Sequence, residues 1–305
     1  MPGLHSLCFS PPSFSNSATS QLASLPGSKP SSLGSAASSF KNHSPSEIPI
    51  SLPDLPSHVK EKILSLEIMG IDSGRALSLN PALLDASPDS IHSVISYLCS
   101  KGIHHKDLAR IFGMCPKLLT SSIRSDLSPV FAFLSHDLNV PDARFRRVIN
   151  KCPRLLASSV RDQLRPAFVY LQRLGFRDTN ALALQDPVLL VSSVENTLIP
   201  KLDFLIGMGL SREEAVGMVL RCPGLFTFSV ENNFKPKYEY LVEEMGGTLE
   251  ELKEFPQYFA FSLEKRIKPR HQEMMMGRGT KLPLSVMLKS TDDEFKELLM
   301  MQNGV

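Results

Sequence analysis

The sequence predicts an all-α fold, a helical-repeat solenoid, and three observations lead to that prediction. A phrase of the form xPxLL returns along the chain, and a second proline follows the first by thirteen residues in five consecutive repeats. Apolar residues near the second proline recur at offsets of three and four, which is the spacing of one helical face. No segment shows the apolar–polar alternation of a half-buried strand.

The xPxLL phrase begins at seven prolines, and the last copy is degenerate. The copies are NPALLDAS at Pro81, CPKLLTSS at Pro116, CPRLLASS at Pro153, DPVLLVSS at Pro187, CPGLFTFS at Pro223, FPQYFAFS at Pro256 and LPLSVMLKS at Pro283. The second prolines are Pro129, Pro166, Pro200, Pro236 and Pro269. In the first repeat the place of the second proline is taken by Val94. Residues 55–300 therefore divide into about seven repeats that must stack to cover their apolar faces.

Each repeat is expected to contain two helices and a tight turn. The second proline fits the first turn of a helix, because its missing N–H costs no hydrogen bond there. The apolar face of that helix includes Leu127, Phe131 and Leu134 in one repeat. The second helix begins at a capping box such as Ser211 to Glu214 and ends before the next phrase proline. The phrase itself is predicted to form a 3₁₀-like turn whose closing serine caps the next element of the chain.

Residues 1–46 differ in composition from the rest of the chain. They contain fifteen serines, Lys29 and Lys41, and no Asp, Glu or Arg. We expect this segment to be disordered, since it cannot bury enough apolar area to offset the cost of ordering its backbone. A leader without acidic residues and rich in hydroxyls is typical of a transit peptide, and the lack of arginine favours a plastid. The sequence predicts a disordered plastid transit peptide over 1–46, with an ordinary disordered tail as the alternative, and a repeat domain over 47–305.

The charge of the chain gives no signal of polyanion binding by itself. The formal net charge is +2, and the two lysines of residues 1–46 account for all of it. The remainder of the chain is neutral overall, so a nucleic-acid interface depends on where the basic residues lie.

The sequence offers little other chemistry. Cys115, Cys152 and Cys222 precede phrase prolines in repeat phase, which indicates core packing as reduced thiols, and no zinc-type spacing is present. HExxH, GxSxG and Walker A motifs are absent, and no apolar run is long enough to span a membrane. We therefore expect no enzyme, no catalytic residue, no metal, no cofactor and no membrane partner.

Repeats with xPxLL and a second proline thirteen residues later resemble the mTERF family of mitochondrial transcription termination factor-like proteins, and this chain resembles a compact plastid member. The resemblance covers about residues 55–300. It implies a left-handed superhelix of helical triplets that binds double-stranded DNA along its concave side. It also implies a function in transcription termination or pausing, or in the processing and steady-state level of plastid transcripts. The implied location is the chloroplast, with the mitochondrion as alternative, and the implied partners are double-stranded DNA, structured organelle RNA, or both, and other plastid gene-expression proteins.

The candidate nucleic-acid-binding residues are the Lys and Arg that recur near fixed points of the repeat. Placement at matching points would stack them into rows of positive charge that follow a phosphate backbone without reading its sequence. They are Arg110, Lys117, Arg146, Arg147, Lys151, Arg154, Arg161, Arg165, Lys201, Arg221, Lys235, Lys237, Arg266, Lys268 and Arg270. Lys and Arg near helix ends also complement the helix dipole, which is the alternative for each residue taken alone.

Other functions for a helical array remain open at this stage. A protein-binding scaffold would carry a hydrophobic rather than a basic concave face, and an RNA-binding factor for plastid intron splicing would share the basic face. An RNA reader of the pentatricopeptide type has the same period. Two phased prolines fit a three-element repeat better than the plain helix pair of that class.

Overall fold

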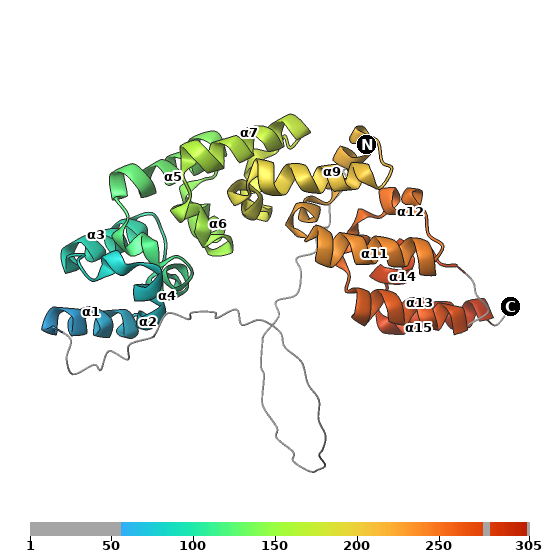
Figure 1. The fold of residues 1–305 in the computed structure, drawn as a ribbon, viewed down its shortest axis with the longest axis horizontal. Helices are drawn as coiled ribbons and strands as arrows, with labels where there is room; N and C mark the ends of the chain where they lie inside the picture. The colour runs from blue at the N-terminus through green and yellow to red at the C-terminus, as the bar shows by residue number, and fades with distance from the viewer. Residues whose placement is uncertain (1–55, 277–280, 304–305) are drawn as a thin grey trace, which may run out of the picture. The chain divides into compact units, whose positions relative to one another are not determined.

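The computed structural model describes residues 56–276 and 281–303, all within one compact unit of the chain. Every regular element in these two ranges is helical, so the predicted all-α repeat fold is confirmed (Figure 1). The predicted transit peptide over 1–46 and its boundary lie outside the described residues. The α-helices are α1 (Ser57–Ile68), α2 (Ser73–Leu79), α3 (Pro88–Ser100), α4 (His105–Met114), α5 (Ser128–Ala132), α6 (Phe145–Lys151), α7 (Arg165–Leu174), α8 (Thr179–Gln185), α9 (Ile199–Gly207), α10 (Arg212–Arg221), α11 (Lys235–Glu239), α12 (Leu249–Glu254), α13 (Lys268–Met276), α14 (Leu284–Lys289) and α15 (Asp292–Asn303).

The xPxLL phrases form the 3₁₀ turns that the sequence predicts. The turns are Pro81–Leu83, Pro116–Thr120, Pro153–Ala157, Pro187–Val191, Pro223–Thr227 and Pro256–Ala260. Leu118, Leu155 and Leu189, one from each of three successive turns, have no exposed surface. The degenerate phrase differs, because Pro283 directly precedes the α-helix α14 instead of opening a 3₁₀ turn.

The serine that closes each phrase caps the helix after it, as predicted. Ser122, Ser159, Ser193, Ser229 and Ser262 each have an extended backbone and accept a hydrogen bond from the N–H three residues on. The predicted capping boxes Ser211–Glu214 and Thr248–Glu251 are also present, at the starts of α10 and α12.

The helix that carries the second proline starts earlier than the sequence predicts. It begins at the capping serine with five residues of π-helix, and the proline lies in the α-helical part that follows. The π turns are Ile123–Leu127, Val160–Leu164, Val194–Leu198, Val230–Phe234 and Leu263–Ile267, and two of these helices also end in π turns, Phe133–Asp137 and Tyr240–Glu244. In one repeat the N–H of Leu127 donates to the carbonyl of Ser122, five residues back.

A proline seven residues beyond the cap explains the π turn. Inside an α-helix its ring clashes with the carbonyl four residues back and its missing N–H leaves that carbonyl unpaired. A π turn shifts the pairing by one residue and widens the helix just before the proline. The first repeat supports this explanation, because α3 carries Val94 at the matching place and is α-helical from Pro88 to Ser100.

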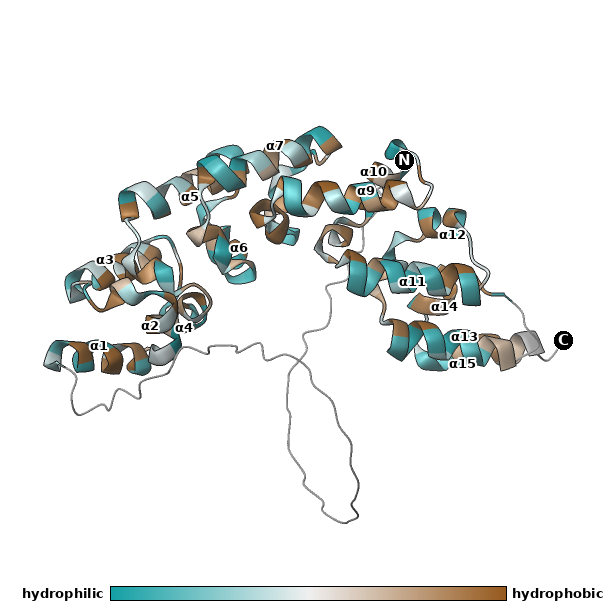
Figure 2. Ribbon diagram, viewed as in Figure 1, coloured by the Kyte–Doolittle hydropathy of each residue, from teal (hydrophilic) through white to brown (hydrophobic). Residues whose placement is uncertain are grey.

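The repeats are held together by a continuous apolar core. Helices such as α5, α7 and α9 show both apolar and polar sides (Figure 2). The 3₁₀ turns of neighbouring repeats contact one another, and α6 contacts α8. Cys115 and Cys152 are buried, Cys222 is half-buried, and all three lie at the ends of second helices as thiols that form no disulfide within the described residues. None of the helices in the described ranges is both long and apolar enough to cross a bilayer.

Candidate nucleic-acid interface

The fifteen predicted basic residues fall into two groups, one for each helix of the repeat. From α3 to α9 the repeats follow a curve, with α5 and α7 on its outer side and α4 and α6 on its inner side (Figure 1). Arg161, Arg165, Lys201, Lys235, Lys237, Arg266, Lys268 and Arg270 belong to the helix of the second proline. Arg110, Lys117, Arg146, Arg147, Lys151, Arg154 and Arg221 belong to the second helix or to the 3₁₀ turn after it.

Three cations of the first group point into the protein rather than toward a ligand. Lys201, Lys237 and Arg270 each follow a second proline by one residue. The ammonium of Lys201 donates to the carbonyl of Phe226 at 2.5 Å, and that of Lys237 donates to the carbonyl of Phe259 at 2.6 Å. Each bond joins one repeat to the 3₁₀ turn of the next.

Burial removes two of these residues from the predicted interface. Lys237 is 6% exposed and Arg270 is 4% exposed, and Arg270 Nη1 donates to the carbonyl of Met287. Burial also lowers the pKa of Lys237 to about 8, because the charged ammonium is desolvated. A phosphate on the surface cannot reach either group, so we leave both out of the interface.

Four more cations of the first group are engaged by carboxylates. Lys235 pairs with Glu231 at 2.6 Å and Lys268 with Glu264 at 2.5 Å, both one helical turn away. Arg165 pairs with Asp137 at 3.1 Å, and Arg266 with Asp292 at 3.5 Å. The guanidinium of Arg266 also donates to the carbonyls of Leu288 and Ser290. Within the described residues, Arg161 is the one member of this group that combines exposure to solvent with the lack of a hydrogen-bond or ion-pair partner.

Three cations of the second group cap the second helix of the next repeat. Arg110 donates to the carbonyl of Asn150, Lys151 to that of Gln185, and Arg221 to that of Lys253 at 2.5 Å. These carbonyls lie at helix C-termini, where a cation satisfies an orphan acceptor and complements the helix dipole. All three side chains are nevertheless exposed, so they bind between repeats and still face solvent.

An ion pair fixes α4 against α6. Arg146 Nε donates to Asp107 Oδ2 at 2.6 Å, and its Nη2 donates to Oδ1 at 3.3 Å. These hydrogen bonds lower the pKa of Asp107 to about 2. Arg146 therefore neutralises the one carboxylate that either helix carries and sets their relative position.

The remaining cations of the second group line one surface on α4, α6 and their 3₁₀ turns. Arg147 and Lys151 are one turn apart on α6, and Arg110 reaches across from α4 to Asn150 beside them. Lys117 and Arg154 take the second place of the turns that follow α4 and α6, and these turns contact each other. Burial raises the pKa of the Cys115 and Cys152 thiols, and the positive charge of the nearby Arg154 offsets part of that rise.

Three exposed cations that the sequence analysis missed belong to the same helix layer. Lys106 lies one turn before Arg110, Arg144 precedes α6, and Arg75 on α2 takes the repeat position of Arg110 and Arg147. The repeat register of Arg75, six residues before a phrase proline, is a signal that could have found it. We use the term basic surface for eight exposed cations on the second helices of these repeats and the turns beside them, which are Arg75, Lys106, Arg110, Lys117, Arg144, Arg147, Lys151 and Arg154.

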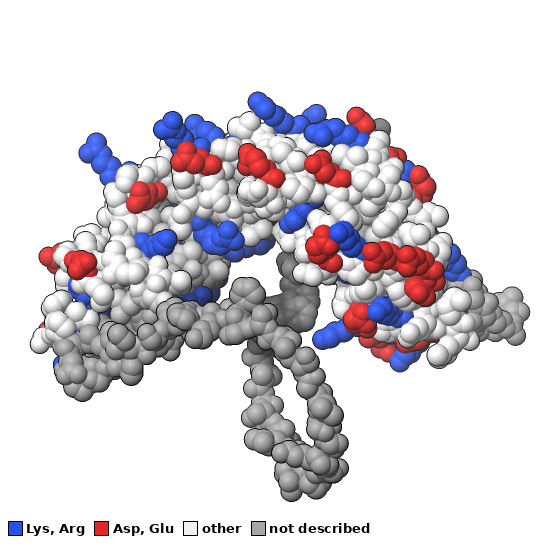
Figure 3. All heavy atoms as spheres, in the orientation of Figure 1, with Lys and Arg blue, Asp and Glu red and all other residues white. Residues whose placement is uncertain are grey.

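Charge is distributed unevenly along the described repeats. Lys and Arg gather over α4 and α6 on the inner side of the curve and also along its outer side over α5 and α7, whereas Asp and Glu are dense over α11, α12 and α13 (Figure 3). α2 and α6 carry no carboxylate, but α12 carries three glutamates and one lysine. A basic surface is therefore present on the first repeats of the second-helix layer.

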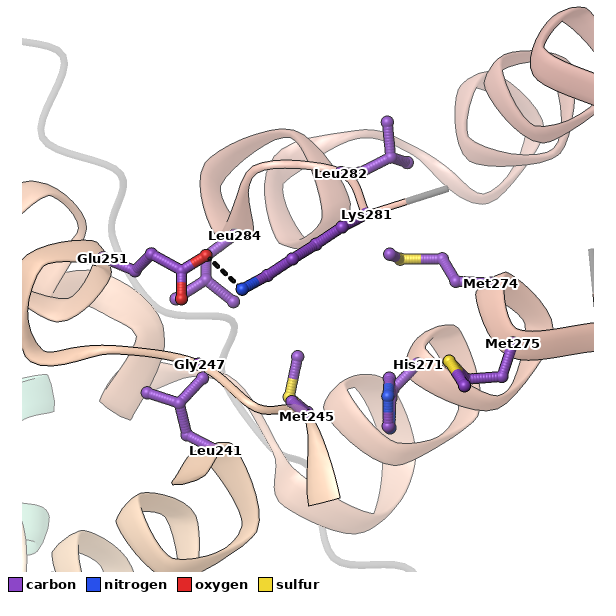
Figure 4. Close-up of a pocket in the computed structure, with 10 residues that line it drawn as sticks. All are labelled: Leu241, Met245, Gly247, Glu251, His271, Met274, Met275, Lys281, Leu282 and Leu284. Atoms are coloured by element: carbon purple, nitrogen blue, oxygen red, sulfur yellow. Dashed lines mark ion pairs between the residues drawn. The ribbon is translucent and has the colours of Figure 1, made fainter. Parts of the chain in front are cut away.

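The described residues also form a cavity of about 190 Å³ among α12, α13 and α14 (Figure 4). Six of the ten side chains drawn in Figure 4 are Leu or Met, and Lys281 pairs with Glu251 at 2.9 Å on one wall. The Nδ1 atom of His271 lies 2.9 Å from the hydroxyl of Tyr240, and burial lowers the pKa of this imidazole. Within the described ranges, no three His, Cys, Asp or Glu side chains are grouped to hold a metal ion.

Comparison with known families gives two matches along the chain. The family model described as mTERF matches residues 57–184 and again residues 182–296. Together the two matches cover α1 to α14 and most of the residues that the structure describes.

Proposed function

The chain belongs to the mTERF family, and we propose that it binds double-stranded nucleic acid through the basic surface to control the expression of plastid genes. Proteins of this family are organellar nucleic-acid binders that act in gene expression and are not enzymes.

The observation that carries the proposal is that some cations of the basic surface have no partner within the described residues, unlike Arg110 and Lys151, which donate to carbonyls of the next repeat. Among the described residues, no hydrogen bond or ion pair engages the side chains of Lys117 or Arg147. An exposed row of such cations, with the one carboxylate of α4 neutralised by Arg146, favours a ligand that carries regularly spaced negative charges. Double-stranded nucleic acid fits this requirement. Cations of this kind bind phosphates and do not read bases.

The plastid assignment is supported by the composition of residues 1–46, which are rich in serine and free of acidic residues and arginine. Within a plastid, we propose termination or pausing of transcription, or processing of transcripts, as the step that binding controls. An intron-splicing factor would use the same surface on structured RNA, so the choice of ligand separates these functions.

The test is a binding titration with the full chain. Duplex DNA, duplex RNA and single strands of the same sequence are titrated at several salt concentrations. We expect duplex binding that falls steeply as salt rises, because the release of counterions governs such binding. Absence of binding, or binding that does not respond to salt, would contradict the proposal.

A triple variant tests the surface itself. Replacing Lys117, Arg147 and Arg154 by Ala is expected to weaken binding about equally for all sequences. It is expected to make the slope of log K against log salt less negative by about 3. Arg146 and Lys151 are left in place, since they also join repeats and their loss would disturb the fold. A circular dichroism spectrum like that of the wild type shows that the loss of binding is not loss of folding.

A further inference from the structure

We propose that the nucleic acid is held by the first three repeats alone and that the interface ends at α8. This inference rests on the proposed function and deepens it, since it says which part of the array contacts the phosphates. It predicts a short footprint, whereas the two matches to the family model span nearly all of the described repeats.

The first argument comes from the position six residues before each phrase proline. Read from the first repeat to the sixth, this position carries Arg75, Arg110, Arg147, Ala181, Gly217 and Glu250. The three arginines are exposed and lie on α2, α4 and α6. The same place in the fold is therefore positive in three successive repeats, neutral in the next two and negative in the sixth.

The residue after each phrase proline changes in the same way. Lys117 and Arg154 take this place in the second and third repeats, and Val188, Gly224 and Gln257 take it in the following three. Two positions of the repeat thus lose their cations at the same boundary. Since a phosphate backbone needs charge at successive repeats, the loss of both positions ends the interface between α6 and α8.

Carboxylates become more frequent in the second-helix layer at the same boundary, between α6 and α8. Lys151, at the end of α6, donates to the carbonyl of Gln185. Burial raises the pKa of the neighbouring Asp186 carboxyl, and the positive charge of Lys151 offsets part of that rise. Beyond this point the second-helix layer presents Glu213 and Glu254 to solvent, and Glu250 pairs with Lys253. Glu213 and Glu254 would repel a backbone that continued along the array.

The size of the basic surface limits the number of phosphates that can be bound. It has eight exposed cations, and two of them, Arg110 and Lys151, also donate to carbonyls of the next repeat. For duplex DNA we therefore expect a slope of log K against log salt between about −5 and −7. A duplex held along all six phrases would give a steeper slope.

The experiment compares two matched pairs of substitutions in the full chain. One variant carries Arg75→Ala and Arg147→Ala within the proposed interface. The control carries Arg212→Ala and Lys265→Ala, which remove two exposed cations beyond α8 and leave the net charge equal to that of the first variant. Duplex binding of both is titrated against salt, together with that of the wild type.

We expect the first pair to weaken binding and to make the slope less negative by about 2, while the control binds within twofold of the wild type. A third variant, Ala181→Arg, places an arginine six residues before the phrase proline of the fourth repeat, as in the first three repeats. It is expected to make the slope more negative by about 1. Equal losses in the two pairs would overturn the inference, as would an unchanged slope in the third variant. Salt-independent or absent binding by the wild type would instead contradict the proposed function.

Discussion

The first three repeats and the last three have the same fold but use their cations differently. On α2, α4 and α6 the arginines Arg75, Arg110 and Arg147 are exposed to solvent. In the later repeats Lys237 and Arg270 are buried and donate to carbonyls of the next repeat. The residue one place after the second proline is apolar in the earlier repeats, as at Val130 and Ala167. Basic residues in repeat phase join neighbouring repeats in both helix layers, but they stay exposed on the second helices and become buried next to the second proline of the later repeats.

The largest expected effect tests whether the two regions are equal in the core. Leu155 in the third repeat and Leu225 in the fifth occupy the same place of the phrase, and neither has any exposed surface. Replacing either by Ala is expected to destabilise the fold by about 2–5 kcal/mol, through lost burial and the cavity left behind. Urea unfolding followed by circular dichroism measures both variants. A cost confined to one region would show that the repeats do not share one core design.

A smaller effect is expected at Lys237, where the two regions differ most. The pKa of its ammonium is lowered to about 8, so between pH 8 and its ordinary value of 10.5 the unfolded chain binds more protons than the folded chain. Stability is therefore expected to rise with pH across that window, because the cost of burying a charge disappears as the ammonium deprotonates. The variant Lys237→Met should lose this rise, as measured by urea unfolding at pH 7.5 and pH 10.

The variant Lys237→Met also allows the two regions to be compared in their contribution to duplex affinity. A residue that is 6% exposed cannot contact a phosphate, so duplex affinity is expected to stay within twofold of the wild type at pH 7. The matched exposed variant is Arg147→Ala, which should weaken binding and reduce the salt slope by about 1. A comparable loss from Lys237→Met, with folding intact, would place Lys237 in the interface.

The sequence predicts the repeat, its 3₁₀ turns and its caps because these depend on local chemistry. Proline fixes a backbone angle and serine accepts a backbone N–H, so both act within a few residues of their own position. Whether a cation stays exposed or bonds to a carbonyl depends instead on the residues of the next repeat that lie beside it. Arg110 and Asn150 are joined over forty residues, and Lys237 and Phe259 over twenty-two. Spacing along one repeat carries no information about such contacts, so Arg270 and Arg147 look alike in sequence.

The π turns were missed for a different reason. Proline is common in the first helical turn, and the sequence offers two starting points, the second proline and the serine seven residues earlier. The structure uses the serine, as at Ser159 before Pro166, so the proline falls inside the helix. The clash between the proline ring and the carbonyl four residues back then decides how the first turn is wound.

The smallest expected effect tests that explanation by making a later repeat resemble the first. Pro166 is exposed, and α3 with Val94 at the matching place has no π turn. The variant Pro166→Ala supplies an N–H that can bond to the carbonyl four residues back, so Val160–Leu164 is expected to become α-helical. Stability should change by only about 1 kcal/mol, since the new hydrogen bond offsets the greater freedom of the unfolded chain. In the wild type the N–H of Arg165 donates to the carbonyl of Val160, and NMR couplings across this hydrogen bond report the winding directly. If the bond persists in the variant, the capping serine and the packing of the turn impose the π winding, and the proline only tolerates it.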